Sequence, residues 1–296
     1  MTSQTLRRLD AGTDAMSIRF TPVIPTRSRG HGRFAVRSAD LSGLLPQVSP
    51  VVVMDDFRVS GHPFGPHPHA GFSAVTYVLE DSPGGLRSRD SLGGDVIVGP
   101  GGMVWTQAGR GAFHDEMPAE PGRELHGLQV FVNLSRAHKD VAPQVLYLDG
   151  PDVPEWRGEG GRVRVLMGSY DGVTSPLVAA EPFDWLDIDV RKNFAFALQE
   201  GRNALVYVLA GAVRVQADDA AQTVPTGHAI GLHGGAGQVI FEVGQGARFV
   251  LLSGKAIDEP VVSHGPFIMS STAEVQDALE RLRRGDMGRL APLGAA

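Results

Sequence analysis

Short apolar segments recur along the whole chain, and clusters of glycine, proline, serine and aspartate separate them. The segments are rich in β-branched and aromatic residues, which favour strands. The clearest are residues 51–54, 74–79, 95–98, 103–106 and 128–132. Many short strands with regular turns between them are typical of β-sandwiches and small β-barrels. The pattern therefore predicts an all-β protein.

The hydrophobic period changes near the end of the chain. Residues 271–274 read Ser-Thr-Ala-Glu, which matches a helix-capping box. Val275, Leu279 and Leu282 follow at helical spacing, and Gly285 stands where a helix would stop. We expect one short C-terminal α-helix that covers part of a barrel.

The strand pattern repeats within the chain. Residues 71–79 align with residues 201–209, an offset of 130. Further along, Pro100 and Gly102 align with Pro225 and Gly227, an offset of 125, which a longer turn in the first copy would explain. Two copies of one barrel fused head to tail account for both offsets. A stretch rich in proline, glycine and aspartate, residues 148–161, separates them, so we expect domains at 1–150 and 151–296.

Composition narrows the class of protein. The 296 residues are 42% hydrophobic, enough for two cores, and include 38 glycines and 20 prolines. The net charge of −6 comes without a long basic block, which disfavours direct nucleic-acid binding. The absence of cysteine excludes disulfides, thiolate metal sites and cysteine nucleophiles. Neither a signal peptide nor a long apolar run is evident, so we expect a soluble cytoplasmic protein without membrane contact.

Two short motifs in the first copy carry the candidate chemistry: His67-Pro-His69 and His114-Asp-Glu116. In a strand, residues i and i+2 point to the same face, so each motif would aim two ligands in one direction. Two such strands side by side would form a site of three imidazoles and one carboxylate. This set suits Fe(II), Mn(II), Ni(II), Cu(II) or Zn(II), and the donors alone do not choose among them.

The second copy lacks these ligands. Carried across by the two offsets, the four positions fall on Ala197, Gln199, Val239 and Phe241. The fold therefore does not need the ligands, which favours a functional role for them in the first copy.

Other polar residues suit supporting roles. We expect His62 on the surface or beside the ligands, and His126 either as a structural residue or as one that orients a ligand. Asp115 should face away from the metal, and Arg110 and the Arg89-Asp90 pair should stabilise turns. The remaining histidines, which have no partner at ligand spacing, are expected to be structural or solvated: His31, His138, His228, His233 and His264. The sequence contains no nucleophile elbow and no P-loop motif.

The chain resembles the pirin family, whose members are bicupins of the cupin superfamily. The resemblance runs through these segments: 67–72, 75–79, 89–93, 100–101, 105, 108–111, 114–118, 126–134 and 264–269. It implies two tandem cupin barrels of the double-stranded β-helix (jelly-roll) type. It also implies a metal, often iron, held in the N-terminal barrel by His67, His69, His114 and Glu116, and a C-terminal barrel without metal. The chain departs from the family pattern at Ser73, Ser88 and Gly102, and none of these changes removes a ligand.

The resemblance implies two functions. Several pirins resemble quercetin 2,3-dioxygenases, in which a flavonol binds Fe(II) or a similar ion and O2 opens the ring with release of CO. In that hypothesis Glu116 is the catalytic base, and Phe72, Trp105 and Phe113 line the pocket. The alternative is an iron-dependent, redox-sensing regulatory protein that binds a transcription factor or a metabolic enzyme. A structural bicupin with a vestigial metal is a third interpretation. We expect a monomer.

Overall fold

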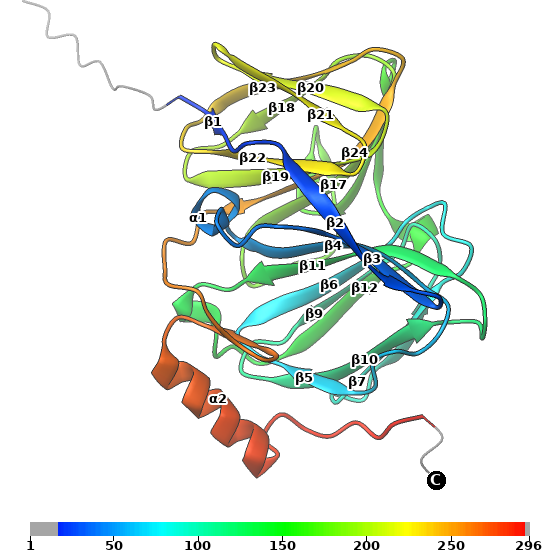
Figure 1. Cartoon of the computed structure of the whole chain (residues 1–296), viewed down its shortest axis with the longest axis vertical. Helices are drawn as coiled ribbons and strands as arrows, with labels where there is room; N and C mark the ends of the chain where they lie inside the picture. Colours follow the sequence, from blue (N-terminus) through cyan, green and yellow to red (C-terminus); the bar gives the residue numbers. More distant parts are fainter. Residues whose placement is uncertain (1–16, 294–296) are drawn as a thin grey trace, which may run out of the picture.

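Two β-barrels lie one above the other along the long axis of the molecule (Figure 1). The computed structural model describes residues 17–293. The first barrel is built mainly from the blue to green part of the chain and the second from the green to orange part. This arrangement confirms the predicted all-β class and the repeat of one barrel.

A 14-stranded sheet runs through both barrels, and neighbouring strands in it are hydrogen-bonded. Its order is β12 (Gln144–Leu148), β9 (Met103–Gln107), β6 (Phe72–Val78), β11 (Leu125–Asn133), β4 (Val51–Val59), β3 (Phe34–Ala39), β2 (Ile24–His31), β22 (His228–His233), β19 (Arg202–Ala210), β24 (Ala247–Lys255), β17 (Phe183–Val190), β14 (Gly161–Met167) and β13 (Glu155–Gly158). Strand β1 (Arg19–Phe20) pairs with β22 outside this path.

Each barrel is completed by a four-stranded sheet. In the first barrel the order is β5 (His67–His69), β10 (Ala112–Pro118), β7 (Leu86–Asp90) and β8 (Asp95–Val98). In the second it is β18 (Phe194–Leu198), β23 (Gly237–Val243), β20 (Ala212–Ala217) and β21 (Ala220–Pro225). The two orders correspond strand by strand, as two copies of one fold require.

The remaining elements are short. Two hairpins are formed by β15 (Ser169–Tyr170) with β16 (Val173–Thr174) and by β25 (Val262–His264) with β26 (Phe267–Met269). The helices are α1 (Leu45–Val48), α2 (Thr272–Arg284) and the 3-10 turns η1 (Arg136–His138) and η2 (Gly150–Asp152). None of the helices in residues 17–293 has both the length and the apolar character needed to cross a bilayer.

The predicted capping residues delimit helix α2. The Ser271 hydroxyl accepts a 3.2 Å hydrogen bond from the backbone N–H of Glu274. The Glu274 carboxylate accepts from the backbone N–H of Ser270, one residue before the position usual in a capping box. Gly285 ends the helix with a left-handed φ of 78°, a conformation that glycine adopts without strain.

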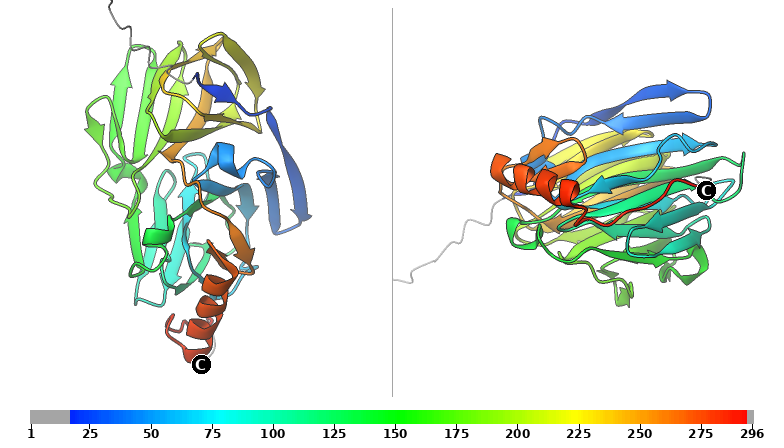
Figure 2. Two further views of the ribbon diagram at one scale, coloured as in Figure 1. Left: turned by 90° about the vertical axis from the view of Figure 1, so that its left-hand side faces the viewer. Right: turned by 90° about the horizontal axis from the view of Figure 1, so that it is seen from below.

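The two ends of the described chain cross between the barrels. Strand β1 and the first residues of β2 pair with β22 of the second barrel, and β2 then continues to the first barrel (Figure 1). At the other end, α2 lies against the first barrel (Figure 2), where Val275 packs with Ala70 and Phe113. Each barrel is therefore partly closed by chain from the far end of the sequence.

The interior of the two barrels differs. The second barrel is filled by apolar side chains, among them Phe194, Phe241 and Phe249. A further apolar cluster, which includes Trp105 and Trp185, joins the two barrels. The first barrel is instead hollow on one side, and the candidate site lies there.

Candidate metal centre

Three histidines converge inside the first barrel because β5 and β10 pair in antiparallel register. His114 lies opposite His67, and Ala112 lies opposite His69. Since alternate residues of a strand share a face, His67, His69 and His114 all point inward. One ring nitrogen of each can be chosen so that all three lie within 4.8 Å of one another. This is the only such cluster among residues 17–293.

The ring nitrogens are arranged as metal ligands require. Nδ1 of His67 lies 2.9 Å from the carbonyl oxygen of Gly65, which leaves its Nε2 facing His114 at 3.1 Å. Nδ1 of His69 and Nδ1 of His114 are buried and have no hydrogen-bond partner within the described part of the chain. Buried polar atoms without partners are rare unless an ion or water occupies the site. The donor set therefore fits a divalent transition metal.

The protonation states also fit. Burial, aided by the neighbouring His67, lowers the pKa of His69 to about 3. Burial lowers the pKa of His114 well below its usual value, and the imidazoles of His69 and His67 add to the effect. Both rings are neutral near pH 7, which is the form that binds metal.

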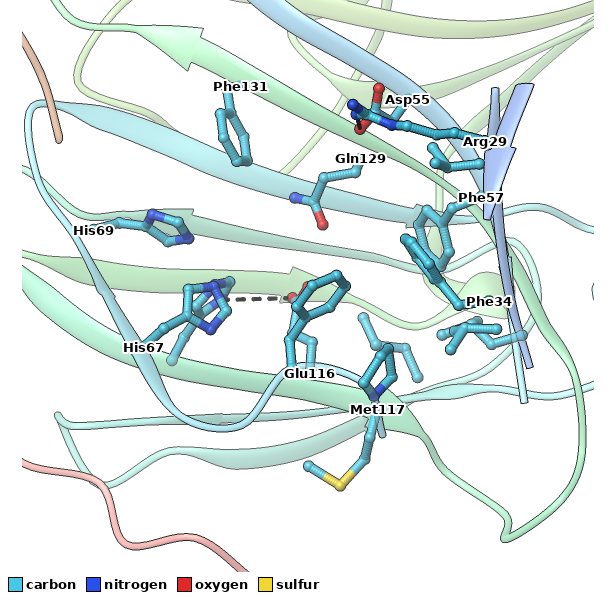
Figure 3. Close-up of a pocket in the computed structure, with 17 residues that line it drawn as sticks. Arg29, Phe34, Asp55, Phe57, His67, His69, Glu116, Met117, Gln129 and Phe131 are labelled. Atoms are coloured by element: carbon cyan, nitrogen blue, oxygen red, sulfur yellow. Dashed lines mark hydrogen bonds and ion pairs between the residues drawn. The ribbon is translucent and has the colours of Figure 1, made fainter. Parts of the chain in front are cut away.

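Glu116 lies at the edge of the histidine cluster. Its Oε1 is 4.0 Å from Nδ1 of His114 (dashed line in Figure 3), and its Oε2 accepts a 2.6 Å hydrogen bond from the Thr76 hydroxyl. Glu116 is not part of the histidine cluster, and its bond to Thr76 engages one of its two carboxylate oxygens. Burial raises the pKa of Glu116 to about 7, although hydrogen bonds from Thr76 and Ser88 act in the opposite direction.

Asp115 faces the opposite side of β10, as its position between the proposed ligands His114 and Glu116 predicts. Its side chain is fully buried, and its Oδ1 lies 2.5 Å from Nε2 of His62. Nη1 of Arg89 is 3.4 Å from its Oδ2. Arg89 also donates a 2.6 Å hydrogen bond to the carbonyl of Ala291, so it joins this strand to the C-terminal segment. Asp90 stabilises a turn, as expected, by accepting from the backbone N–H of Leu92.

A cavity of about 340 Å³ opens in front of the histidines. Its wall is largely apolar and includes four phenylalanines, Phe34, Phe57, Phe64 and Phe131, beside aliphatic side chains. Arg29 and Asp55 lie on the side away from His67 and His69 (Figure 3), with Nη2 of Arg29 3.7 Å from Oδ2 of Asp55. The volume falls in the range of sites for small organic molecules.

The prediction that Phe72, Trp105 and Phe113 line the pocket was wrong, because none of them lines the cavity. Phe72 is buried behind His69, with ring centroids 5.0 Å apart. Trp105 points into the cluster between the barrels, and Phe113 points toward α2. Periodicity predicted the strands correctly but not which face of each strand meets the cavity.

Of the two roles considered for His126, structural or ligand-orienting, the structure supports the structural one. Nε2 of His126 lies 3.0 Å from Oδ1 of Asp56, and neither residue lines the cavity. Two of the histidines expected to be structural or solvated form local hydrogen bonds. Nδ1 of His138 lies 2.7 Å from Oε1 of Glu181, and Nδ1 of His228 contacts the carbonyl oxygen of Thr226.

The second barrel carries apolar residues at the four ligand positions, but two of them differ from the prediction. Val239 pairs with Phe196 as His114 pairs with His67, so the counterparts of His67 and His69 are Phe196 and Leu198. The predicted counterparts of His67 and His69, Ala197 and Gln199, were each wrong by one residue. The reason is the turn: two residues separate β5 from β6, whereas three separate β18 from β19. The conclusion that this copy lacks ligands stands.

Sequence reasoning missed two polar residues beside the site, Thr76 and Gln129. The Thr76 hydroxyl lies 3.1 Å from Oε1 of Gln129, whose Nε2 donates to the carbonyl of Val75. Each is a polar residue between two apolar neighbours, Val75 and Tyr77 beside Thr76 and Leu128 and Val130 beside Gln129. That exception to the pattern is the signal that could have identified them, because a buried polar side chain needs a partner.

Comparison with known proteins agrees with this architecture. The Pirin family model matches residues 35–132, and the model of the pirin C-terminal cupin domain matches residues 185–288. Mouse pirin is 35% identical over 249 residues, which cover 82% of this chain and 84% of the relative.

Solved structures show the same two-barrel fold. A quercetin 2,3-dioxygenase from Acinetobacter baumannii superposes with a TM-score of 0.80 at 25% identity, covering 93% of this chain and all of that chain. A bacterial pirin from Escherichia coli in complex with nickel(II) has a TM-score of 0.63 at 17% identity, with 81% and 100% covered. From its two tandem cupin barrels, its family-model matches and its similarity to mouse pirin, this chain belongs to the pirin family.

Proposed function

We propose that this protein is a metal-dependent dioxygenase that cleaves flavonols such as quercetin with O2 and releases CO. One observation carries the proposal: the imidazoles of His67, His69 and His114 converge, and they line one cavity of about 340 Å³ together with the Glu116 carboxyl group. The similarity to a quercetin 2,3-dioxygenase from Acinetobacter baumannii supports it.

His67, His69, His114 and Glu116 would hold one divalent metal, for which we propose Fe(II). The Escherichia coli pirin, which shares the fold, was solved in complex with nickel(II), and this supports the choice of a divalent transition metal. When bound, the metal would supply Lewis acidity and a template for both reactants. The gap between the Glu116 carboxylate and the imidazoles is small enough for a side-chain rotation to bring it in, at the expense of its bond to Thr76.

Glu116 is also the proposed catalytic base. If one carboxylate oxygen of Glu116 binds the metal, the other can take the proton of the flavonol 3-hydroxyl. With its pKa near 7, the carboxyl group can accept and return a proton at neutral pH.

The cavity wall suits a flat, polyphenolic substrate. Phe57 and Phe131 present aromatic surface for the rings, and Arg29 and Asp55 offer polar contacts at the end away from the histidines (Figure 3). In the proposed reaction, one flavonol and one O2 give one phenolic ester and one CO. Two carbon–carbon bonds of the central ring break and both oxygen atoms enter the products, so no external reductant is needed.

The test is quercetin turnover with CO detection. Metal-free protein is reloaded with Fe(II), Mn(II), Ni(II), Cu(II) or Zn(II) and assayed in air beside His69→Ala and Glu116→Gln. His228→Ala, which removes a histidine from the second barrel, is the matched control. We expect metal-dependent CO release that both site variants lose and the control keeps.

Metal binding without CO release from any reloaded form would overturn the dioxygenase proposal. It would favour the regulatory alternative, in which the same four residues hold a metal that governs binding to a protein partner.

A further inference from the structure

Two aromatic rings meet at the rim of the cavity. Phe34 lies at the start of β3, and Phe64 lies in the loop 60–66 between β4 and β5. Their ring centroids are 5.3 Å apart and their planes meet at 88°, an edge-to-face contact. Both residues line the cavity, and the Phe64 side chain is 55% exposed to solvent. The pair therefore lies between the cavity and solvent.

Few contacts hold the loop 60–66 in place. The backbone N–H of Ser60 donates to the carbonyl of Arg33, one residue before Phe34. The carbonyl of Gly65 contacts Nδ1 of His67 at 2.9 Å. Between these two ends, the side chain of His62 reaches Asp115 at 2.5 Å. The His62–Asp115 contact is thus the hydrogen bond by which a side chain of the loop itself is tied to the barrel.

This anchor ends on an unusual partner. Asp115 is fully buried, lies on the strand between His114 and Glu116, and has the Arg89 guanidinium as a second partner. A buried carboxylate needs such partners, because its charge is costly to bury alone. Strand β10 therefore holds the His62 side chain in place through Asp115, and His62 in turn holds the loop 60–66.

We propose that Phe34 and Phe64 form an aromatic gate over the cavity and that His62 is a positioning residue that keeps the gate closed through Asp115. The inference rests on the proposed function, since a gate of two rings suits a flat aromatic substrate that can pass between or against them. An edge-to-face contact of two rings is weak, so the gate can open. When closed, it limits the access of water and larger solutes to the metal.

Access of a chelator to the metal tests the gate without any substrate. Protein loaded with Co(II) is mixed with EDTA, and the second-order rate constant for metal removal is followed by the cobalt absorption. We expect removal to be about tenfold faster or more in Phe64→Ala and His62→Ala, because an open loop exposes the site. Tyr147→Ala, at an exposed position on β12, is the control that should keep the wild-type rate.

A second pair of measurements separates the gate from general damage to the fold. His62→Gln, whose amide can still donate to Asp115, should return the rate toward that of the wild type. Equilibrium Co(II) affinity should stay within about twofold in Phe64→Ala, since this ring is on the rim and offers no ligand atom. A faster removal explained by unfolding would instead appear in both variants together with a lower affinity, and His62→Gln would not reverse it.

The outcomes are distinct from those of the turnover assay. Removal rates in Phe64→Ala and His62→Ala that match Tyr147→Ala would overturn the gate, whatever quercetin does. Gate effects without CO release would keep the gate and remove the dioxygenase. Failure of the wild-type protein to take up any metal would overturn both.

Discussion

The hydroxyl of Tyr207, in the second barrel, donates a 2.7 Å hydrogen bond to Oδ2 of Asp56, in the first. The reverse contact also exists, since the Tyr77 hydroxyl of the first barrel donates to Asp187 of the second at 2.5 Å. Tyr77 and Tyr207 occupy matching positions in the repeat, with the offset of 130. Each barrel therefore reaches a buried carboxylate of the other, and the interface keeps the symmetry of the repeat although the site does not.

Removing one of these hydroxyls should weaken the interface. In Tyr207→Phe, Asp56 loses a donor while it stays buried with Arg37 and His126. We expect the free energy of unfolding to fall by about 1–3 kcal/mol, measured by urea denaturation. Tyr147→Phe, at an exposed tyrosine, should change it by less than about 0.5 kcal/mol. Equal stabilities for the two variants would show that the contact between the barrels contributes nothing.

Metal affinity should depend on pH through Glu116. Because its pKa is raised to about 7, the metal-free carboxyl keeps its proton below that pH and must lose it to bind. Affinity should therefore rise by up to about tenfold per pH unit below 7 from this proton and level off above 7. Calorimetric titration in buffers of different ionisation enthalpy would count the released proton. In Glu116→Gln this part of the dependence should vanish, and an unchanged slope would assign the proton elsewhere.

The same pKa shift makes a prediction for the stability of the metal-free protein. A raised pKa means that the folded state binds more protons than the unfolded state between pH 4.5 and about 7. The stability that Glu116 contributes is thus fully present below pH 4.5 and is lost as the pH rises through about 7. The melting temperature of the wild type minus that of Glu116→Gln should therefore decrease as the pH rises from 4.5 to about 7. A difference that increases with pH over this interval would contradict the raised pKa.

The protein should bind one metal ion per chain. Phe241, the counterpart of Glu116, belongs to the apolar cluster that fills the second barrel. In Phe241→Ala we expect a loss of about 3–5 kcal/mol of unfolding free energy with metal stoichiometry unchanged. In His114→Ala we expect the bound metal to be lost with a smaller change in stability. Elemental analysis of dialysed protein with urea denaturation would check both, and metal retained by His114→Ala would move the site elsewhere.

Arg89 should matter more to stability than its neighbour Arg87. Arg89 is buried against Asp115 and Ala291, whereas Arg87 forms an exposed ion pair with Asp95. Arg89→Met should cost about 3 kcal/mol or more, since it leaves a buried carboxylate with one partner fewer. Arg87→Met should cost at most about 1 kcal/mol. Denaturation curves of the two variants would test this, and similar midpoints would show that Asp115 does not need Arg89.

Local pattern was enough to predict the strands, the repeat, the C-terminal helix and the motifs that bring the histidines together. Each of these features depends on residues close in sequence. The alternation of side chains along a strand places His67 and His69 on one face, and the capping box at residues 271–274 starts a helix regardless of what the helix packs against. The physical reason is that strand and helix periods are properties of the backbone itself.

Tertiary structure decided what depends on pairing between distant segments. A turn with one extra residue moved the second-barrel counterparts from Ala197 to Phe196, because a shift of one residue exchanges the two faces of a strand. In the same way, the cavity wall came from Phe34 and Phe64, on a hairpin and a loop, and not from Phe113. Alternation tells which residues share a face, but only the packing of the whole chain determines whether that face meets a cavity, a core or a helix.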